Sequence, residues 1–166
     1  MSKDFLNLED AGHQLAEIVD AKPVAVIALV GQGAEIAIAL ARKFEVPVIP
    51  SVITRDSVTN EVIGVAIPAA TQSGLVYMVD DAVETGHTTR VAFTAATQAG
   101  FTDIRVAVPV CPRDTGSELF PITGDIIAVK RPMVRRSLSW HYVETPSTTQ
   151  EAALSLISQH NLMLSQ

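Results

Sequence analysis

The chain has 166 residues, a length typical of one domain that can bury a core without disulfide bonds or a structural metal. Hydrophobic residues make up 48% of the composition and charged residues 18%, which favours a folded α/β protein with a covered sheet over a disordered chain. The net charge of -6 and the isoelectric point near 5.1 argue against broad binding to nucleic acid or to an anionic membrane. A small-molecule ligand fits this composition better.

Cysteine content and the N-terminal sequence bear on the compartment. Cys111 is the only cysteine, so no internal disulfide can form, which is consistent with a reducing compartment. The N-terminal sequence MSKDFLNLED carries acidic residues where a signal peptide has an apolar run, and no stretch reaches the roughly 18 to 20 apolar residues that span a bilayer. We therefore expect a cytoplasmic protein with a single domain over residues 1–166 and with no membrane or nucleic acid partner.

The first part of the chain predicts a helix, a buried strand and a second helix. Apolar residues recur at helical spacing over residues 8–19, so we expect an amphipathic helix that ends before Pro23. The continuous apolar run 23–30 predicts a strand buried on both faces, stopped by Gly31-Gln32-Gly33. Residues 34–44 are rich in Ala, Ile and Leu and end with cations that suit a helix C-terminus, so a second helix is expected there.

A second strand is expected at residues 46–53, but its two prolines cannot donate hydrogen bonds, so its ends or one edge should be unpaired. Residues 54–72 break the pattern around the β-prone run 62–67, which indicates a hairpin or a mobile excursion. Further strands are expected at 75–79, 103–110 and 125–129, with helices at 88–100 and about 148–159. This order predicts an α/β fold: a doubly wound, mainly parallel sheet flanked by helices, with a short hairpin excursion.

The most informative segment begins where the strand 75–79 ends. Asp80 and Asp81 follow this strand directly, and the residues Thr85-Gly86-His87-Thr88-Thr89 then open a helix. Gly86 permits a tight turn, and backbone N–H groups and hydroxyls at a helix N-terminus form a cradle for a phosphate monoester. The two carboxylates can accept hydrogen bonds from a sugar diol. Phosphate at one end and vicinal hydroxyls close by predict a site for ribose 5-phosphate.

The segment from Val76 to Thr89 resembles the signature of the type I phosphoribosyltransferases: an apolar strand, two acidic residues, two or three variable residues, then Thr-Gly-x-Thr. The resemblance implies that fold, with a small C-terminal hood at about residues 130–145. It implies transfer of a 5-phosphoribosyl group from phosphoribosyl pyrophosphate to a nucleobase or related nitrogen acceptor, with release of pyrophosphate. Mg²⁺ is the implied cofactor, contacting Asp80 and Asp81 through the ribose or water.

The same resemblance assigns roles within the segment. Asp80 and Asp81 become the partners of the ribose hydroxyls, and residues 84–89 become the 5-phosphate loop. Glu84 occupies the position of an aspartate that, in the 6-oxopurine branch of the family, is proposed to handle a proton on the base, so it is the candidate catalytic residue. His87 either adds a donor to the phosphate or faces solvent. Without the resemblance, the two acids could simply end a strand and Thr85 could cap a helix.

Two other segments occupy positions that matter in this family. Gly31-Gln32-Gly33 stands where the family has its pyrophosphate-binding loop; it could instead be a helix-opening turn, or part of a dinucleotide fingerprint in which Ile36 replaces the third glycine. Residues 54–72 stand in the place of the family's mobile loop. Their only cation, Arg55, either meets the pyrophosphate or is solvated.

Residues 124–142 resemble the family's hood segment. Trp140 is the candidate for stacking on a base, although it could instead be a core residue. A third of the 12 cations lie close together in this segment, at Lys130, Arg131, Arg135 and Arg136. Three environments are open for them: an anionic ligand, a partner subunit or water. We expect a homodimer, the habit of the family. A regulatory module that binds phosphoribosyl pyrophosphate or a nucleotide without turnover, and a dinucleotide-dependent oxidoreductase, are the rival functions.

Overall fold

A six-stranded sheet, in the order β3-β2-β1-β4-β5-β6, forms the centre of the computed structural model, which describes residues 3–166. Its parallel strands are β1 (Ala25–Val30), β2 (Val48–Arg55), β4 (Leu75–Val79), β5 (Asp103–Val110) and β6 (Ile127–Lys130). The edge strand β3 (Val62–Ala66) is antiparallel to β2. The sheet is therefore mainly parallel, as the sequence predicts.

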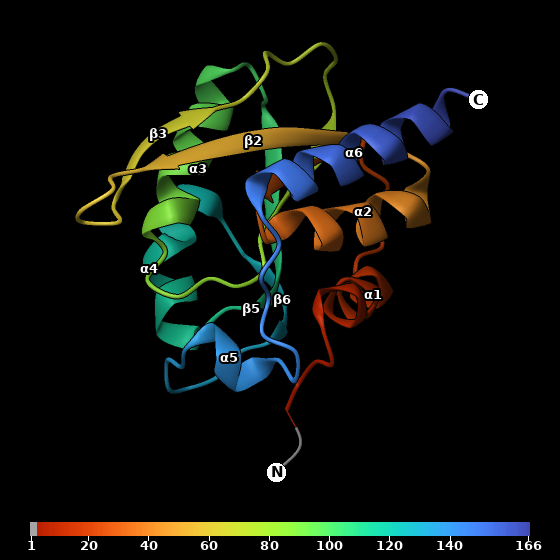
Figure 1. Cartoon of the computed structure of the whole chain (residues 1–166). Coiled ribbons are helices and arrows are strands. Elements are labelled where there is room, and N and C mark those ends of the chain that lie inside the picture. Colours follow the sequence, from red (N-terminus) through yellow and green to blue (C-terminus); the bar gives the residue numbers. More distant parts are fainter. Residues whose placement is uncertain (1–2) are drawn as a thin grey trace.

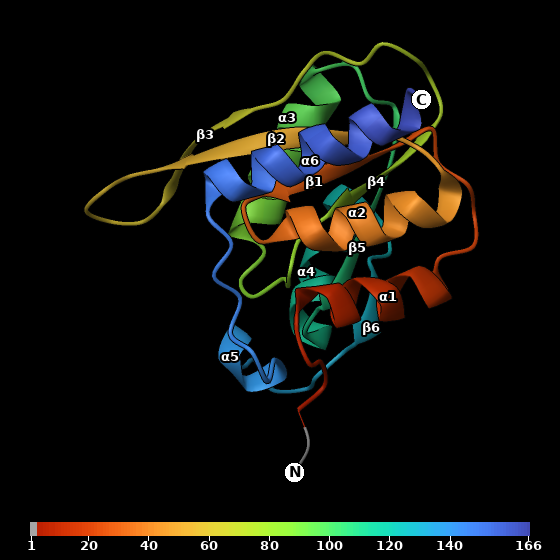
Figure 2. The same ribbon diagram turned by 45° about the vertical axis from the view of Figure 1, so that its right-hand side comes forward.

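Helices cover both faces of the sheet (Figure 1 and Figure 2). One face packs against α1 (Leu8–Ile18), α2 (Gly33–Phe44) and α6 (Gln150–Leu164), and the other against α3 (His87–Gln98) and α4 (Arg113–Thr123). A short helix, α5 (Leu138–His141), lies in the predicted hood segment. Together with the sheet order, this confirms the predicted doubly wound α/β class.

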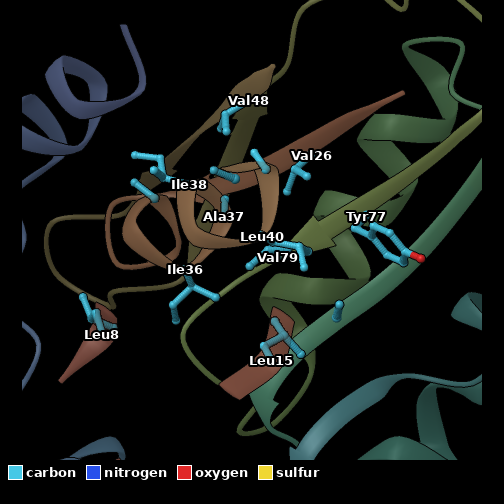
Figure 3. Packing of buried hydrophobic residues seen from close by; sticks show 14 of the residues in the cluster. Leu8, Leu15, Val26, Ile36, Ala37, Ile38, Leu40, Val48, Tyr77 and Val79 are labelled. Atoms are coloured by element: carbon cyan, nitrogen blue, oxygen red, sulfur yellow. The ribbon is translucent and has the colours of Figure 1, made fainter. Parts of the chain in front are cut away.

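The central strand β1 shows why its sequence is uninterruptedly apolar. Its residues 26, 28 and 30 pack in the cluster beneath α1 and α2, while residues 25, 27 and 29 pack in the cluster beneath α3 and α4. Every residue of β1 is buried. Figure 3 shows the first cluster, where Val26 meets Leu40 of α2 and Tyr77 and Val79 of β4. A strand covered on both faces needs apolar side chains at every position.

The excursion after β2 is a hairpin, one of the two forms expected. β2 begins at Val48 and ends at Arg55, two residues later than predicted. It pairs with β1 from Val48 to Val52 and with β3 only from Val52 onward, so Pro50 has no partner on the β3 edge. Asn161 of α6 binds both backbone groups of Val48, at 2.9 Å each. The expected unpaired edge of the proline-containing strand is thus present and covered by a side chain.

Other elements also differ from the prediction, in their presence or in their bounds. α4 was not predicted, because Gly116 and Pro121 interrupt its pattern; Pro121 lies in the last turn, where one lost hydrogen bond matters least. β6 begins at residue 127 rather than 125. α6 continues to Leu164, and His160 beyond the predicted end donates to the carbonyl of Val46, just before β2, at 2.9 Å. No helix within residues 3–166 has both the length and the apolar composition to cross a lipid bilayer.

Candidate functional site

The site residues predicted from the sequence gather at the carboxyl ends of β1 and β4. These two strands are neighbours, and the chain leaves them in opposite directions across the sheet, towards β2 from β1 and towards β5 from β4. Such a reversal of strand order leaves a crevice at the sheet edge where α/β proteins bind ligands. Gly31 follows β1 and Asp80 follows β4, so both segments open into this crevice.

The loop after β4 presents a helix N-terminus without a side-chain cap. Gly86 precedes α3 with φ of +84°, a left-handed conformation that favours glycine, and a Cβ there would lie 3.0 Å from Leu119 Cδ1. Thr88 and Thr89 lie in the first turn of α3, half-buried and buried respectively, while Thr85 is exposed just before it. The His87 N–H donates to Thr85 Oγ1 at a long 3.4 Å, and the N–H groups of Thr88 and Thr89 that follow in the first turn are available to an anion.

Asp80 and Asp81 are half-buried at the base of the crevice, and the Asp81 backbone N–H donates to Asp80 Oδ1 at 2.8 Å. Burial, together with the neighbouring charge of Asp81, raises the pKa of Asp80 well above its ordinary value. Burial also raises the pKa of Asp81. Two crowded, poorly solvated carboxylates favour a ligand that offers hydrogen-bond donors or a cation.

Two adjoining hollows meet at this acid pair. The first, of about 380 Å³, is lined by the chain from Asp80 to Gly86 with Thr88, Thr89, Arg55, Asn60 and Leu138. The second, of about 200 Å³, is lined by Gly31 and Gln32 with the ends of β1 and β2. Arg55, Asp80, Asp81 and Thr88 line both hollows. The structure thus brings together the acid pair, the phosphate loop and the turn after β1.

Close packing shapes the turn after β1. A Cβ at Gly33 would lie 2.7 Å from the Val79 carbonyl oxygen, so only glycine lets α2 begin this close to the end of β4. The Gln32 side chain is turned away, since its Oε1 accepts from the Thr148 N–H at 3.0 Å. Glu35 in turn accepts from the Thr148 hydroxyl. On the side of this turn the second hollow is therefore bordered by backbone, and its one lining cation, Arg55, comes from the end of β2.

Arg55 reaches back from the hairpin to the phosphate loop. Its Nη2 donates to Thr88 Oγ1 and its Nη1 to the Asn60 carbonyl, both at 3.1 Å. It is the only lysine or arginine among the residues that line the two hollows. Arg55 is exposed, so its position is compatible with both roles that the sequence leaves open, contact with the pyrophosphate and solvation.

Glu84 is exposed at the rim of the first hollow, and its backbone carbonyl is held by Thr115, a residue that sequence reasoning missed. The buried Thr115 of α4 donates its hydroxyl to the Glu84 carbonyl at 2.9 Å. Arg135 then donates to Thr115 Oγ1 at 3.0 Å. This chain ties the hood to the phosphate loop.

Three predicted residues, Gly33, His87 and Trp140, are not among those that line the two hollows. His87 is exposed at the start of α3. Trp140 is 47% exposed on α5, with the Arg136 guanidinium 4.3 Å from its ring centroid. Leu138, on the same short helix, does line the first hollow. The hood therefore presents an apolar side chain to the crevice, but this side chain is Leu138 and not Trp140, the residue predicted from the sequence.

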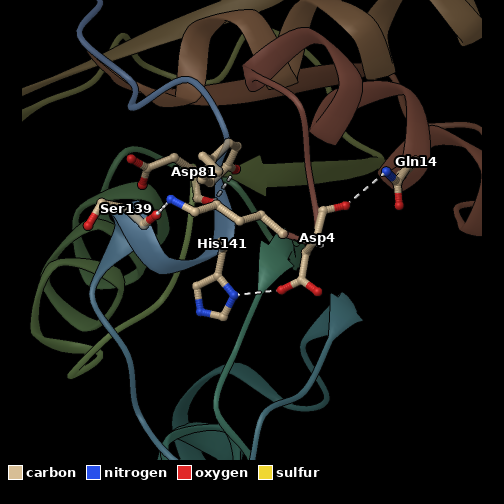
Figure 4. A network of polar contacts seen from close by, with 7 residues as sticks. Asp4, Gln14, Asp81, Ser139 and His141 are labelled. Atoms are coloured by element: carbon tan, nitrogen blue, oxygen red, sulfur yellow. Dashed lines mark hydrogen bonds and ion pairs between the residues drawn. The ribbon is translucent and has the colours of Figure 1, made fainter. Parts of the chain in front are cut away.

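The hood is anchored from below by the N-terminal segment, as Figure 4 shows. His141 Nδ1 lies 2.7 Å from Asp4 Oδ2, and the ring of Phe5 packs on that of Tyr142 with centroids 5.3 Å apart. The Tyr142 hydroxyl donates to the Asp81 carbonyl at 3.0 Å. Burial and the nearby carboxylates raise the pKa of Tyr142, which keeps the hydroxyl a donor. Tyr142 thus links the hood to the acid pair, and no local sequence signal marks it.

The acid pair is compatible with magnesium only together with a substrate. Within residues 3–166, no group of three or more His, Cys, Asp or Glu side chains could enclose a metal ion. Mg²⁺ commonly binds through one or two carboxylates and completes its shell with substrate phosphates and water. Asp80 and Asp81 fit that arrangement, with the remaining ligands supplied by the substrate.

Comparison with known proteins supports the fold. No family model and no curated protein sequence matches the chain. The protein TT1426 from Thermus thermophilus is similar in structure, with a TM-score of 0.76, 18% identity and coverage of 93% of this chain and 98% of that one. A purine phosphoribosyltransferase from Pyrococcus horikoshii Ot3 gives a TM-score of 0.62 at 21% identity, covering 80% and 89% of the two chains.

The similarity extends to a further enzyme of this class. The Giardia lamblia APRTase complexed with 9-deazaadenine gives a TM-score of 0.59 at 14% identity, covering 76% of this chain and 80% of that one. At these identities the similarity concerns the fold alone. The chain has the α/β fold of the phosphoribosyltransferases, which confirms the predicted fold class.

Proposed function

We propose that the protein is a phosphoribosyltransferase, which transfers the 5-phosphoribosyl group of phosphoribosyl pyrophosphate to a nitrogen acceptor such as a nucleobase and releases pyrophosphate. The observation that carries this proposal is the meeting of the two hollows at Asp80 and Asp81. A ribose held by this acid pair would direct its 5-phosphate into the first hollow and its pyrophosphate into the second.

Each binding task has a candidate group. The open N-terminus of α3 and the hydroxyls of Thr88 and Thr89 bind the 5-phosphate. Asp80 and Asp81 accept hydrogen bonds from the ribose hydroxyls, and Arg55 faces the anionic groups from the hairpin. When bound, Mg²⁺ would neutralise charge on the departing pyrophosphate.

In the proposed reaction, the bond from C1 of the ribose to the pyrophosphate oxygen breaks and a bond from C1 to the acceptor nitrogen forms. The pyrophosphate leaves with the electron pair of the broken bond, and the acceptor nitrogen loses its proton. Glu84, exposed at the rim of the first hollow, is the candidate carboxylate for that proton. Leu138 and the hood above it would exclude water from the reacting carbon.

A sensor that binds phosphoribosyl pyrophosphate without turnover is the second candidate. It is favoured by the turn at Gly31 to Gly33, which has no cation, and by the engagement of Gln32 with Thr148. Arg55 would then be the main cation available to the pyrophosphate.

Release of pyrophosphate, measured with a panel of purine and pyrimidine bases in the presence of phosphoribosyl pyrophosphate and Mg²⁺, tests the enzyme against the sensor. A transferase releases pyrophosphate only when a suitable base is present, and the Asp80→Asn, Asp81→Asn protein serves as the negative control. Binding of phosphoribosyl pyrophosphate with no turnover on any base would favour the sensor. Failure to bind it would exclude both.

A further inference from the structure

A third hollow lies on the outer side of α4, away from the crevice. It has a volume of about 580 Å³ and is lined by Arg113, Gly116, Ser117 and Phe120 of α4 with Asp125, Ile126 and Arg131 beside β6. We call it the α4 hollow. It shares no lining residue with the two hollows at the acid pair. The opposite side of α4 carries Thr115 and Leu119, which pack inward, so the same helix separates the two regions.

Two guanidinium groups give the α4 hollow its electrostatic character. Arg113 Nε donates to the Arg131 carbonyl at 3.3 Å, and Arg131 Nη2 donates to the Ile126 carbonyl. Neither side chain forms an ion pair with a carboxylate anywhere in residues 3–166. Because backbone carbonyls already hold both side chains, less conformational freedom is lost when they bind an anion. Two cations thus line one hollow in a chain of net charge -6.

The α4 hollow also offers an apolar surface and neutral polar contacts. Phe120 is 54% exposed although it is a large aromatic residue. It lines the same hollow as the two arginines, and its ring can pack against a second ring. Ser117 adds a hydroxyl, and Asp125 adds a carboxylate that can accept from a donor on the ligand.

We infer that the α4 hollow is a second ligand site, which binds a small aromatic anion: a ring that bears a phosphate or a carboxylate. The anionic group would meet Arg113 and Arg131, and the ring would pack on Phe120. This site is independent of phosphoribosyl transfer, since it uses none of the residues assigned to that reaction.

Titration of the full-length, ¹⁵N-labelled protein with phenyl phosphate, benzoate and inorganic phosphate tests this inference. Phenyl phosphate should shift the backbone amide signals of Gly116 and Ser117, and it should bind about 3- to 10-fold more tightly than inorganic phosphate because of the ring. Tighter binding of phenyl phosphate than of benzoate identifies the anion as a phosphate, and the reverse order as a carboxylate. Equal binding of phenyl phosphate and inorganic phosphate would contradict an aromatic site.

Substitutions locate the binding. Arg113→Gln should weaken the binding of phenyl phosphate about 10- to 100-fold, the range for loss of hydrogen bonds to a charged group. Phe120→Leu keeps an apolar side chain but removes the ring, and should weaken the binding of phenyl phosphate about 3- to 10-fold. Arg42→Gln on α2 and Leu162→Ala on α6, both exposed and on the other face of the sheet, are matched controls. Unchanged affinity in Arg113→Gln and Phe120→Leu, or shifts confined to residues 80–89, would overturn the inference.

Discussion

Replacement of both carboxylates after β4, Asp80→Asn with Asp81→Asn, should remove binding of phosphoribosyl pyrophosphate without disturbing the fold. Each carboxylate is expected to accept a hydrogen bond from one ribose hydroxyl. A hydrogen bond to a charged group contributes about 1.5–3 kcal/mol, so the loss of two corresponds to roughly 3–6 kcal/mol. The dissociation constant should therefore rise by about 10²- to 10⁴-fold. Asparagine has nearly the same shape as aspartate, so packing at the end of β4 is preserved.

Thermal unfolding in the presence of Mg²⁺ measures this loss. A ligand at 100 times its dissociation constant stabilises a native protein by about 2.7 kcal/mol. For a protein of this size, 1 kcal/mol changes the melting temperature by about 2–4 °C, so the wild type should gain about 5–11 °C. At the same ligand concentration the double variant should gain about 1 °C or less. An unmoved wild-type transition, or an equal gain in the variant, would refute the assigned role of the acid pair.

In the absence of ligand, Asp80→Asn should raise the melting temperature of the protein rather than lower it. The pKa of Asp80 is raised above its ordinary value of 3.8, because burial and the charge of Asp81 disfavour the ionised form. The stability that this carboxyl contributes is therefore complete below that ordinary value and is lost as the pH rises through the raised pKa. Asparagine does not ionise, so Asp80→Asn should melt higher than wild type at pH 7, with the difference shrinking as the pH approaches 4. A lower melting temperature at pH 7 would show that the carboxylate stabilises the free protein.

Three further predictions concern turnover, the hood and assembly. Glu84→Gln should lower kcat by about 10²- to 10⁴-fold with little change in the affinity for phosphoribosyl pyrophosphate, if Glu84 accepts the acceptor proton; steady-state kinetics with unchanged kcat and a raised KM would make it a binding residue. If Trp140 stacks on the base, Trp140→Ala should weaken the binding of a nucleotide product by roughly 10- to 100-fold and leave the binding of phosphoribosyl pyrophosphate unchanged. Equal affinities of variant and wild type for the nucleotide, measured by calorimetry, would leave Leu138 as the hood contact. Light scattering should give the mass of a homodimer, with Arg135→Glu and Arg136→Glu weakening it, and a constant mass of 17.7 kDa across concentrations would rule the dimer out.

The fold could be predicted where one local pattern decides the structure. The apolar run of β1 and the segment from β4 through Gly86 to α3 combine a strand, a turn and a helix start within a few residues. α4 was missed because its stability comes from packing of Leu119 and from the bond between Thr115 and the Glu84 carbonyl, and neither is visible in its own sequence. The end of α6 depends likewise on the bonds of His160 to Val46 and of Asn161 to Val48, the first residue of β2.

The same distinction applies to the site. The acid pair and the phosphate loop lie within ten residues of each other, so the sequence alone brings them together. Tyr142 reaches Asp81 across 61 residues, and Thr148 reaches Gln32 across 116. Long-range contacts of this kind depend on how the hood and α6 fold back over the sheet, which no local spacing encodes. Leu138, rather than Trp140, lines the first hollow, and that choice likewise has no signal in the local sequence.

Phosphorus NMR of phosphoribosyl pyrophosphate in the presence of the protein and Mg²⁺ tests the central claim most directly, because it resolves the 5-phosphate from the pyrophosphate. We predict that the 5-phosphate signal shifts or broadens when the wild-type protein is added and stays unchanged with the Asp80→Asn, Asp81→Asn protein. We further predict that addition of a suitable base converts the pyrophosphate signals into free pyrophosphate while the 5-phosphate monoester persists in the product. A 5-phosphate signal that is unaffected by excess wild-type protein would contradict the account.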